Sequence, residues 1–347
     1  MTRPVTAADF LSPPDGVIER LAPTRSAVRG WLGHPWLRFA VRRLLRLAIS
    51  VFALMSGTFA MIHAVPGDPV RAALGLTAPQ SLVDARRHAL GLDRPLGHQY
   101  LHFLHGVITG DLGTSMTAQL PVTQLIGQRL PATAELAGLA FVVVTLIGVP
   151  LGMLAAIRTQ RGRGRGFELG FSVLTGLFAV VPEFLLAVAL VVIFAVGLHA
   201  LPVADRSGPA SYVLPVASLA IGPIAALSRI VRVETQRVLG EDYMRTARAK
   251  RLPARLLYLR HALPNLLTAT LTISGLLLSG LLAGTVLVEN AFAWPGLGTE
   301  LAQSVPQKDY PVVQGLALVF GGGVLLINLV VDVLIAIVDP RSTIRES

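Results

Sequence analysis

Long apolar runs separated by charged segments are the feature that most restricts how this chain can fold. Each run is close to or above the roughly 20 residues that an α-helix needs to cross a bilayer. With 347 residues, 53% hydrophobic and 14% charged, the chain has more apolar surface than a soluble core can hide. The sequence therefore predicts an all-α polytopic membrane protein. The runs cover residues 44–64, 132–157, 167–198, 212–230, 265–288 and 313–337.

The distribution of arginine predicts the orientation of these spans. Four arginines, at 158, 161, 163 and 165, precede the third run, and eight basic residues lie between Arg232 and Arg260. Cytoplasmic loops carry an excess of Lys and Arg, so both segments are expected in the cytoplasm. Only an even number of crossings fits between them. We therefore interpret 167–198 as one tilted or Pro182-kinked span plus its exit. The result is six transmembrane helices in the cell inner membrane, with both termini cytoplasmic.

This topology divides the chain into five parts. Residues 66–131 fall outside the membrane, where Ser81 is a candidate N-cap, Gly91 is a candidate helix stop, and "YLHFLHGVI" has helical spacing of apolar residues. We predict a small extracytoplasmic cap of helices there. The parts are a cytoplasmic N-terminal tail (1–37), a first transmembrane helix (38–65), the extracytoplasmic loop (66–131), a five-helix core (132–342) with a basic element (241–264), and a cytoplasmic C-terminal tail (343–347).

Sequence signatures of catalysis are missing. The lysines, Lys250 and Lys308, are followed by Arg251 and Asp309, so no G-K-[ST] phosphate loop exists. There is no H-E-x-x-H, no G-x-S-x-G, no paired histidines at ligand spacing within a span, and no cysteine. We expect no enzymatic activity, no metal site and no cofactor in this chain. The net charge of +10 lies between apolar runs and indicates topology in a lipid bilayer, with no nucleic-acid partner.

The block "EDYMRTARAKRLPARLLYLRHALPN", residues 241–265, is compact, basic and ordered. Tyr243, Met244 and Ala247 can form one face of a short helix. Pro253 disfavours helical conformation at Leu252 and is a good first residue for a second helix. The pattern predicts helix, break, helix, leading into the fifth span. Such a rigid element can transmit a push from a soluble partner, whereas a purely topogenic loop needs no ordered break.

This block resembles the EAA coupling motif of ABC importer permeases. Arg245, Thr246 and Ala247 fall on the E-A-A positions, and "HALP" (261–264) falls on the I-x-L-P ending. The similarity covers about residues 38–342 and points to the dipeptide, oligopeptide and nickel permease branch. It rests on the joint order of "PGDP", "LGLDRPL", "GDLGTS", "RLPATAEL", "ENAFAWPGLG", "KDYP" and "NLVVDVLIAIVDPR".

The resemblance implies one of two permease subunits of an ATP-driven importer. It implies partner ATPase subunits that carry ATP and Mg, a second homologous permease, and an extracytoplasmic solute-binding protein. Arg251 stands where the family has Gly, and a non-Gly residue in a left-handed turn costs about 1–2 kcal/mol. The residues that the motif assigns to ATPase coupling are Tyr243, Met244, Arg245, Thr246, Ala247, Arg248, Ala249, Lys250, Arg251 and Leu252.

Two acidic residues in or near spans are candidates for the substrate path. Glu183 follows Pro182 within a long apolar run, and a carboxyl group at such a depth normally faces a cavity or a partner. The alternative is a structural pair or a hydrogen-bonded neutral acid. Glu289 lies at the outer end of the fifth span, where an interfacial acid is an equal alternative.

The sequence "AFAWPGLGTEL" predicts a turn on the outer side. Phe292 and Trp294 suit the headgroup level, and Pro295 with Gly296 favours a turn before a short helix from about Thr299. These residues are either interfacial anchors or an outer gate or binding-protein contact, because irregular backbone at this depth usually lines a cavity.

Two other classes of function remain open from the residues. An ion- or proton-coupled secondary transporter would use Glu183 and Glu289 as ion sites, but it predicts inverted repeats, which we do not detect. A scaffold would need no polar groups in mid-span. The cargo, whether dipeptide, longer peptide, metal chelate or another solute, is not indicated.

Overall fold

A computed structural model describes residues 35–64, 69–75, 77–89, 91–162, 164–203 and 206–338. The predicted tails extend mainly beyond these ranges, as does most of "PGDP". In the described part every regular element is helical, apart from an isolated antiparallel bridge between Thr114 and Pro121. The chain divides into two compact units, Met1–Leu44 and Leu45–Ser347. Within the first unit, the guanidinium of Arg43 lies 5.5 Å from the centre of the Phe39 ring. All contacts described below belong to the second unit.

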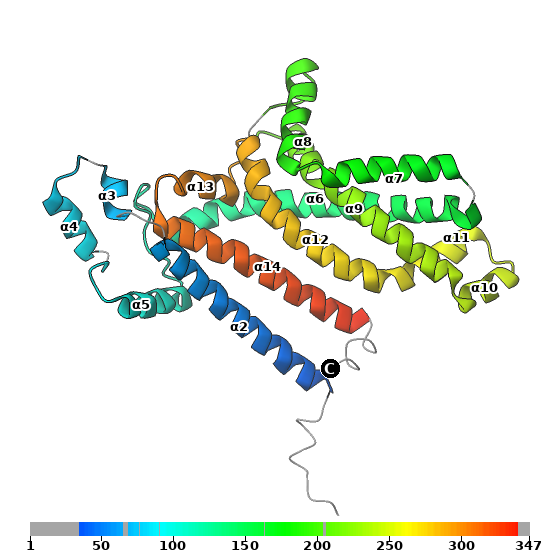
Figure 1. The fold of residues 1–347 in the computed structure, drawn as a ribbon, viewed down its shortest axis with the longest axis horizontal. Helices are drawn as coiled ribbons and strands as arrows, with labels where there is room; N and C mark the ends of the chain where they lie inside the picture. The colour runs from blue at the N-terminus through cyan, green and yellow to red at the C-terminus, as the bar shows by residue number, and fades with distance from the viewer. Residues whose placement is uncertain are drawn as a thin grey trace, which may run out of the picture. The chain divides into compact units, whose positions relative to one another are not determined.

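Long helices are separated by one or more shorter ones along the chain (Figure 1). In chain order they are α2 (Pro35–Ala64), α3 (Pro69–Leu74), α4 (Gln80–Ala89), α5 (Leu96–Thr109), α6 (Val122–Arg158), α7 (Arg165–Val180), α8 (Glu183–Leu190) with a π-helical extension (Val191–Gly197), α9 (Val213–Gly240), α10 (Asp242–Ala249), α11 (Ala254–Leu256) with a π-helical extension (Leu257–Ala262), α12 (Leu263–Ala291), α13 (Leu297–Ser304) and α14 (Tyr310–Val338).

Five helices in the described part are long and apolar enough to cross a membrane, or six if one bent pair counts as a span. The five candidates are Phe39–Met61, Val122–Arg158, Pro209–Gly240, Ile273–Ala291 and Tyr310–Ile337. They coincide with five of the predicted apolar runs. The multi-pass helical membrane architecture is therefore confirmed, whereas the count of exactly six stays a prediction.

The third apolar run is broken more sharply than a proline kink. α7 and the segment Glu183–Gly197 meet at 99°. Val181 and Pro182 both have extended backbone, with ψ of 121° and 145°. Proline disfavours helical conformation at the preceding residue, so two consecutive residues leave the helix. This is a broken or re-entrant segment, and Glu183 begins its second arm.

α6 begins ten residues before its predicted apolar run. Its first turns contain Val122 and Leu125, which are buried against Leu297, Val312 and Leu316 of α13 and α14. The helix continues through Pro131. Proline normally breaks a helix because it lacks an N–H and its ring crowds the preceding turn. Here long-range packing outweighs that local preference, so part of the predicted loop 66–131 belongs to a long helix. The rest contains α3, α4 and α5, two of which match the predicted short helices.

Small residues let the main helices approach closely. In Figure 1 α6 and α9 run alongside each other, and α7 packs against α9. A Cβ atom added at Gly148 would lie 3.1 Å from the Leu227 side chain, and one at Gly152 would overlap the backbone oxygen of Ser228. Helix association in a membrane depends on such close van der Waals contact, since lipid tails are as apolar as leucine. The main core lies along these helices and extends to α10 and α12.

Candidate coupling element and outer polar network

The block 241–264 has the predicted order of helix, break and helix. α9 ends at Gly240, and Glu241 is extended before α10 begins at Asp242. After the break, Pro253 precedes α11, whose π-helical extension joins α12 at Leu263. The arm after the break therefore runs without interruption into a membrane-spanning helix, as the sequence predicts.

The break closes through a Schellman motif. The N–H of Arg251 donates to the oxygen of Arg248 at 2.9 Å, and the N–H of Leu252 donates to the oxygen of Ala247 at 3.5 Å. This closure requires a residue in the left-handed conformation directly after the helix, usually glycine. Arg251 occupies that position with φ of 55°. The resemblance to a Gly-containing motif thus identifies the correct left-handed position, and Pro253, extended with ψ of 145°, starts the next helix.

α10 turns one face into the protein and the other outward. Met244 and Ala247 are buried in the main core. Tyr243, which the sequence places on the same face, is 41% exposed and lies at the edge of that face. Arg248 and Leu252 are half-buried. The outward surface, which we call the α10 outer face, consists of Tyr243, Arg245, Thr246, Ala249, Lys250 and Arg251.

Glu183 lies at the bend between α7 and α8. It is the first residue of α8, where the helix dipole favours a negative charge. Its side chain is half-buried beside α12, since a Cβ added at Gly284 would lie 3.2 Å from the Glu183 Oε1. Within the described residues its carboxylate makes no hydrogen bond or ion pair. The group is therefore available to a ligand or a partner group.

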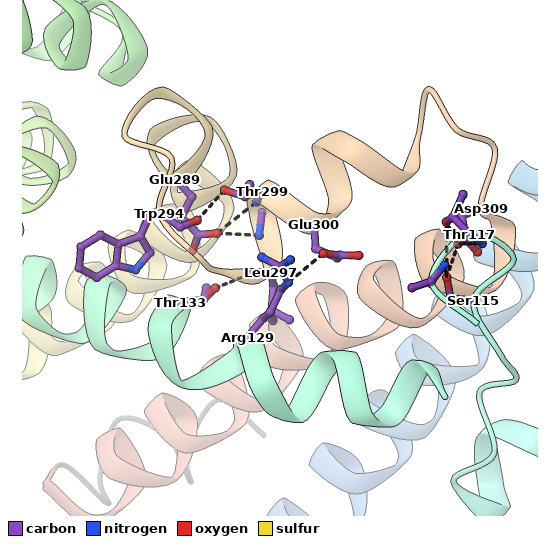
Figure 2. A network of polar contacts seen from close by, with 12 residues as sticks. Ser115, Thr117, Arg129, Thr133, Glu289, Trp294, Leu297, Thr299, Glu300 and Asp309 are labelled. Carbon is purple, nitrogen blue, oxygen red and sulfur yellow. Dashed lines mark hydrogen bonds and ion pairs between the residues drawn. The ribbon is translucent and has the colours of Figure 1, made fainter. Parts of the chain in front are cut away.

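Glu289 lies inside the protein, at the end of α12. Its side chain is fully buried, and its Oε2 accepts hydrogen bonds from the N–H groups of Gly298 and Thr299 at 2.7 and 3.3 Å. These are free N–H groups of the first turn of α13, so the carboxylate caps that helix. A Cβ at Gly296 would overlap the Glu289 carboxylate. A side chain at 296 would therefore have to displace this carboxylate, which Figure 2 shows beside Thr299 and Trp294.

The aromatic residues of the outer turn are core residues. Phe292 and Trp294 are 1% and 0% exposed, where the sequence suggests rings at the headgroup level. The Trp294 indole N–H donates to the backbone oxygen of Ala132 at 3.1 Å, and its ring meets that of Tyr212 edge-on at 4.7 Å. Pro295 and Gly296 then lead into α13, two residues earlier than predicted. A buried Trp with a satisfied N–H positions the turn against α6.

A second buried carboxylate, Asp309, fixes the other end of α13. Asp309 is fully buried between α13 and α14, and its two oxygens accept from the N–H groups of Met116 and Thr117, both at 3.1 Å. The hydroxyls of Ser115 and Thr117 also donate to it. Burial favours the neutral acid, yet these four donors hold the pKa of Asp309 below its usual value. Figure 2 shows the carboxylate enclosed by the 115–117 loop.

The middle of α13 is tied to α6. Arg129 pairs with Glu300 at 2.8 Å, and both side chains are largely buried. The N–H of Leu297 donates to the Thr133 hydroxyl at 2.8 Å. The sequence does not predict that "GDLGTS" and "KDYP" meet, yet Asp309 of the second motif accepts a hydrogen bond from Ser115 of the first. The sequence signals for this contact were an acid next to a helix that begins near a proline, and a turn rich in Ser and Thr. No local pattern indicates that these two segments, almost 200 residues apart, pair with each other.

A shallow cavity of about 660 Å³ opens near the same end of α6. At its edge Arg206 donates to both oxygens of Glu135 at 2.6 Å, and the Tyr212 hydroxyl donates to Glu135 at 2.8 Å. These contacts fasten the loop before α9 to α6. The cavity is lined by Leu139, Arg206, Ser207, Gly208, Pro209 and Tyr212.

Comparison with known proteins assigns the chain to a family. Residues 148–344 match the model for "Binding-protein-dependent transport system inner membrane component", and residues 36–137 match the model for the N-terminal part of such components. The chain belongs to this family. It is accordingly the membrane-embedded permease subunit of an ATP-driven importer, and the predicted resemblance is confirmed.

Similar proteins agree with this family assignment. The chain is 39% identical over 305 residues to a glutathione transport system permease protein (GsiC) of Pectobacterium atrosepticum, covering 88% of this chain and 98% of the relative. It is 36% identical over 304 residues to the GsiC protein of Escherichia coli strain K12, with the same coverage. A solved structure of the MetNI methionine ABC transporter, inward facing, shares the fold at a TM-score of 0.51 and 18% identity. That match covers 62% of this chain and 97% of the other.

We call the polar contacts of Arg129, Thr133, Glu289, Glu300 and Asp309 around α13 the outer polar network. We predict that Asp309→Asn weakens this network. Asparagine keeps the size but replaces one acceptor oxygen by an amide donor that faces other donors, at a cost of about 1–3 kcal/mol. The free energy of unfolding at neutral pH should fall by this amount, measured by thermal or denaturant unfolding in detergent. Asp111→Asn is the control, since Asp111 is exposed and accepts only from the N–H of Gly113.

The effect of Asp309→Asn should depend on pH in one direction. A carboxyl whose folded pKa lies below its unfolded value of about 3.8 stabilises the fold above that value. This contribution disappears as the pH falls through the folded pKa. The difference between wild type and variant should therefore shrink below about pH 4. A constant difference at every pH, or an equal loss in Asp111→Asn, would contradict the role given to Asp309.

Proposed function

We propose that this permease forms, with a second homologous permease, the translocation path for short peptides delivered by an extracytoplasmic binding protein. The observation that carries the proposal is the ordered coupling element joined to α12, together with family membership. ATP and Mg would act on partner ATPase subunits. Family membership favours ATP-driven import over ion-coupled transport. Because relatives are named for glutathione transport, glutathione, a tripeptide, is the first cargo to test.

The distribution of charge supports a coupling element and termini on the cytoplasmic side of the membrane. We place the 241–264 block in the cytoplasm and α3–α5 outside as a helical cap, since basic loops stay on the cytoplasmic side. The loop before α9, with Ser207, then lies outside.

Introduced cysteines test this orientation directly, because the chain has no cysteine of its own. Ser207 and Thr246 are both exposed, so each can carry a label without disturbing the core. In intact cells Ser207→Cys should react with a membrane-impermeant maleimide and Thr246→Cys should not. Both should react after the membrane is opened. The reverse pattern in intact cells would overturn the topology.

The α10 outer face is the proposed docking surface for an ATPase subunit. Its residues are exposed in this chain, whereas Met244 and Ala247 hold the helix to the core. The ion pair between Arg245 and Asp242, 3.2 Å apart, is exposed and so contributes little to stability. Arg245 can therefore exchange that partner for a group on the ATPase at little cost.

Two adjacent substitutions separate docking from folding. Thr246→Asp places a charge on the exposed face and should remove most binding-protein-stimulated ATPase activity, at a docking cost of about 1 kcal/mol or more. The thermal stability of the permease should not change. Ala247→Asp buries an unpaired charge and should lower unfolding free energy by more than about 3 kcal/mol.

Activity of the reconstituted complex and unfolding of the isolated permease are the two measurements. Full stimulation in Thr246→Asp would refute docking through this face. A loss of ATPase stimulation in Thr246→Asp that is accompanied by a matching loss of thermal stability would also refute it.

We also propose that Glu183 faces the substrate path and binds a peptide amino terminus. Its support is a half-buried carboxylate without a partner among the described residues, placed at a bend next to α12. For Glu289 we propose a structural role in place of a contact with the substrate: it holds α13. The turn 292–296 that it supports acts as an outer gate or binding-protein contact.

Glu183→Gln should reduce glutathione uptake into proteoliposomes about tenfold or more, since hydrogen bonds to charged groups contribute about 1.5–3 kcal/mol. Complex assembly and capture by the binding protein should be unchanged. Glu234→Gln is the control, because Glu234 is an α9 acid that pairs with Arg237 one turn away. Uptake unaltered by Glu183→Gln, for both glutathione and N-acetylated peptides, would show that Glu183 is structural.

A further inference from the structure

Histidines are concentrated in the segments proposed to lie outside the membrane. Five of the eight are there, three of them in α5. His98, His102 and His105 follow the i, i+4, i+7 spacing that places side chains on one face of a helix. All three are exposed. Neither the coupling element nor the outer polar network uses them. The five are His88, His98, His102, His105 and His199.

The opposite face of α5 fixes this histidine stripe in place. Tyr100 and Phe103 pack against Phe59 of α2, with ring centres 5.2 and 5.7 Å apart. The Tyr100 hydroxyl is 2.7 Å from that of Ser56. The side chains of the histidine stripe therefore point away from α2.

α5 is also well closed at its end. Gly110 has φ of 80°, and the N–H of Asp111 donates to the oxygen of Gly106 at 2.8 Å. This Schellman closure keeps the last turns helical, including the turn that holds His105. The imidazoles thus stand on a rigid scaffold, which lowers the entropy lost when they bind a ligand.

We propose that His98 and His102 chelate a divalent transition metal ion, with Zn²⁺ as the reference ion. Residues one helical turn apart have Cβ atoms about 5–6 Å apart, which lets two imidazole nitrogens reach one ion at about 2.0–2.1 Å. Histidine at i and i+4 is the pairing used by helical zinc sites, and imidazole also suits Cu²⁺ and Ni²⁺. Within the described residues none of the three imidazoles has a hydrogen-bonded or ionic partner to displace.

The site is an open, two-histidine one. In the part of the chain that the structure describes, no group of three or more His, Cys, Asp or Glu side chains is placed to hold a metal. A closed structural centre is therefore not formed by these residues, and water completes the coordination of the ion. His105, three residues after His102, is the reserve ligand: it can pair with His102 but not easily with His98, which lies almost two turns away.

The test is a titration of the purified permease, in detergent and without a polyhistidine tag, with Zn²⁺ alone by calorimetry. His102→Ala should remove binding, because His102 belongs to both pairs. His98→Ala should weaken binding at least about tenfold, since even loss of an outer-shell contact to a metal ligand costs about 10–100-fold. His105→Ala should have the smallest effect of the three.

His88→Ala is the matched control, because His88 is an exposed histidine on α4 that contacts Asp93 at 2.7 Å. It should bind Zn²⁺ like the wild type. In a second measurement, Zn²⁺ should protect His98 and His102, but not His88, from diethylpyrocarbonate, as mapped by mass spectrometry. Equal affinity in wild type and His98→Ala/His102→Ala, or equal protection of His88, would overturn the proposal. Transport is not measured, so failure here leaves the proposed import function unaffected.

Discussion

A carboxylate in an apolar interior is costly unless hydrogen bonds offset its burial, and α13 is held by two buried carboxylates that accept such bonds. Glu289 receives the first N–H groups of α13, and Asp309 receives four donors just beyond its last turn. α13 has only eight residues, and helices this short are marginal on their own. Its stability therefore comes from these buried contacts, with the Arg129–Glu300 pair between them.

α12 links the buried contacts of α13 to the 241–264 block. It is helical from Leu263 to Ala291, and its C-terminal end carries the carboxylate that caps α13. Its N-terminal end continues through a π-helical segment into α11, and the break separates α11 from α10. Across that break Met244 and Ala247 pack α10 into the same core, so a displacement of α10 reaches the turn 292–296 through this packing and then through α11 and α12. This continuity supports the proposed coupling, because a flexible basic loop would absorb the displacement.

Sequence periodicity was sufficient to predict those elements whose structure depends on local sequence alone. Five of the apolar runs, the short helices α4 and α5, and the break at Pro253 follow from local spacing and from proline chemistry, and all are present. What local spacing did not reveal depends on distant contacts. α6 passes through Pro131 because Val122 and Leu125 pack on α13 and α14, and Trp294 is buried because the Ala132 oxygen accepts its N–H. The partners of Asp309 lie 192 to 194 residues away, so no pattern near Asp309 names them.

Arg251 shows how packing can replace a residue preference in the coupling element. A left-handed arginine costs about 1–2 kcal/mol relative to glycine. The conformational preference of Arg251 therefore does not stabilise the break. Burial of Met244 and Ala247 on one side of it, and of Leu257 on the other, fixes where both arms must lie. Burying a single large apolar side chain contributes about 1.5–3 kcal/mol, which exceeds the strain. The angle of the coupling element is therefore set by its inward-facing side chains, leaving the outward face free to vary with the partner that it meets.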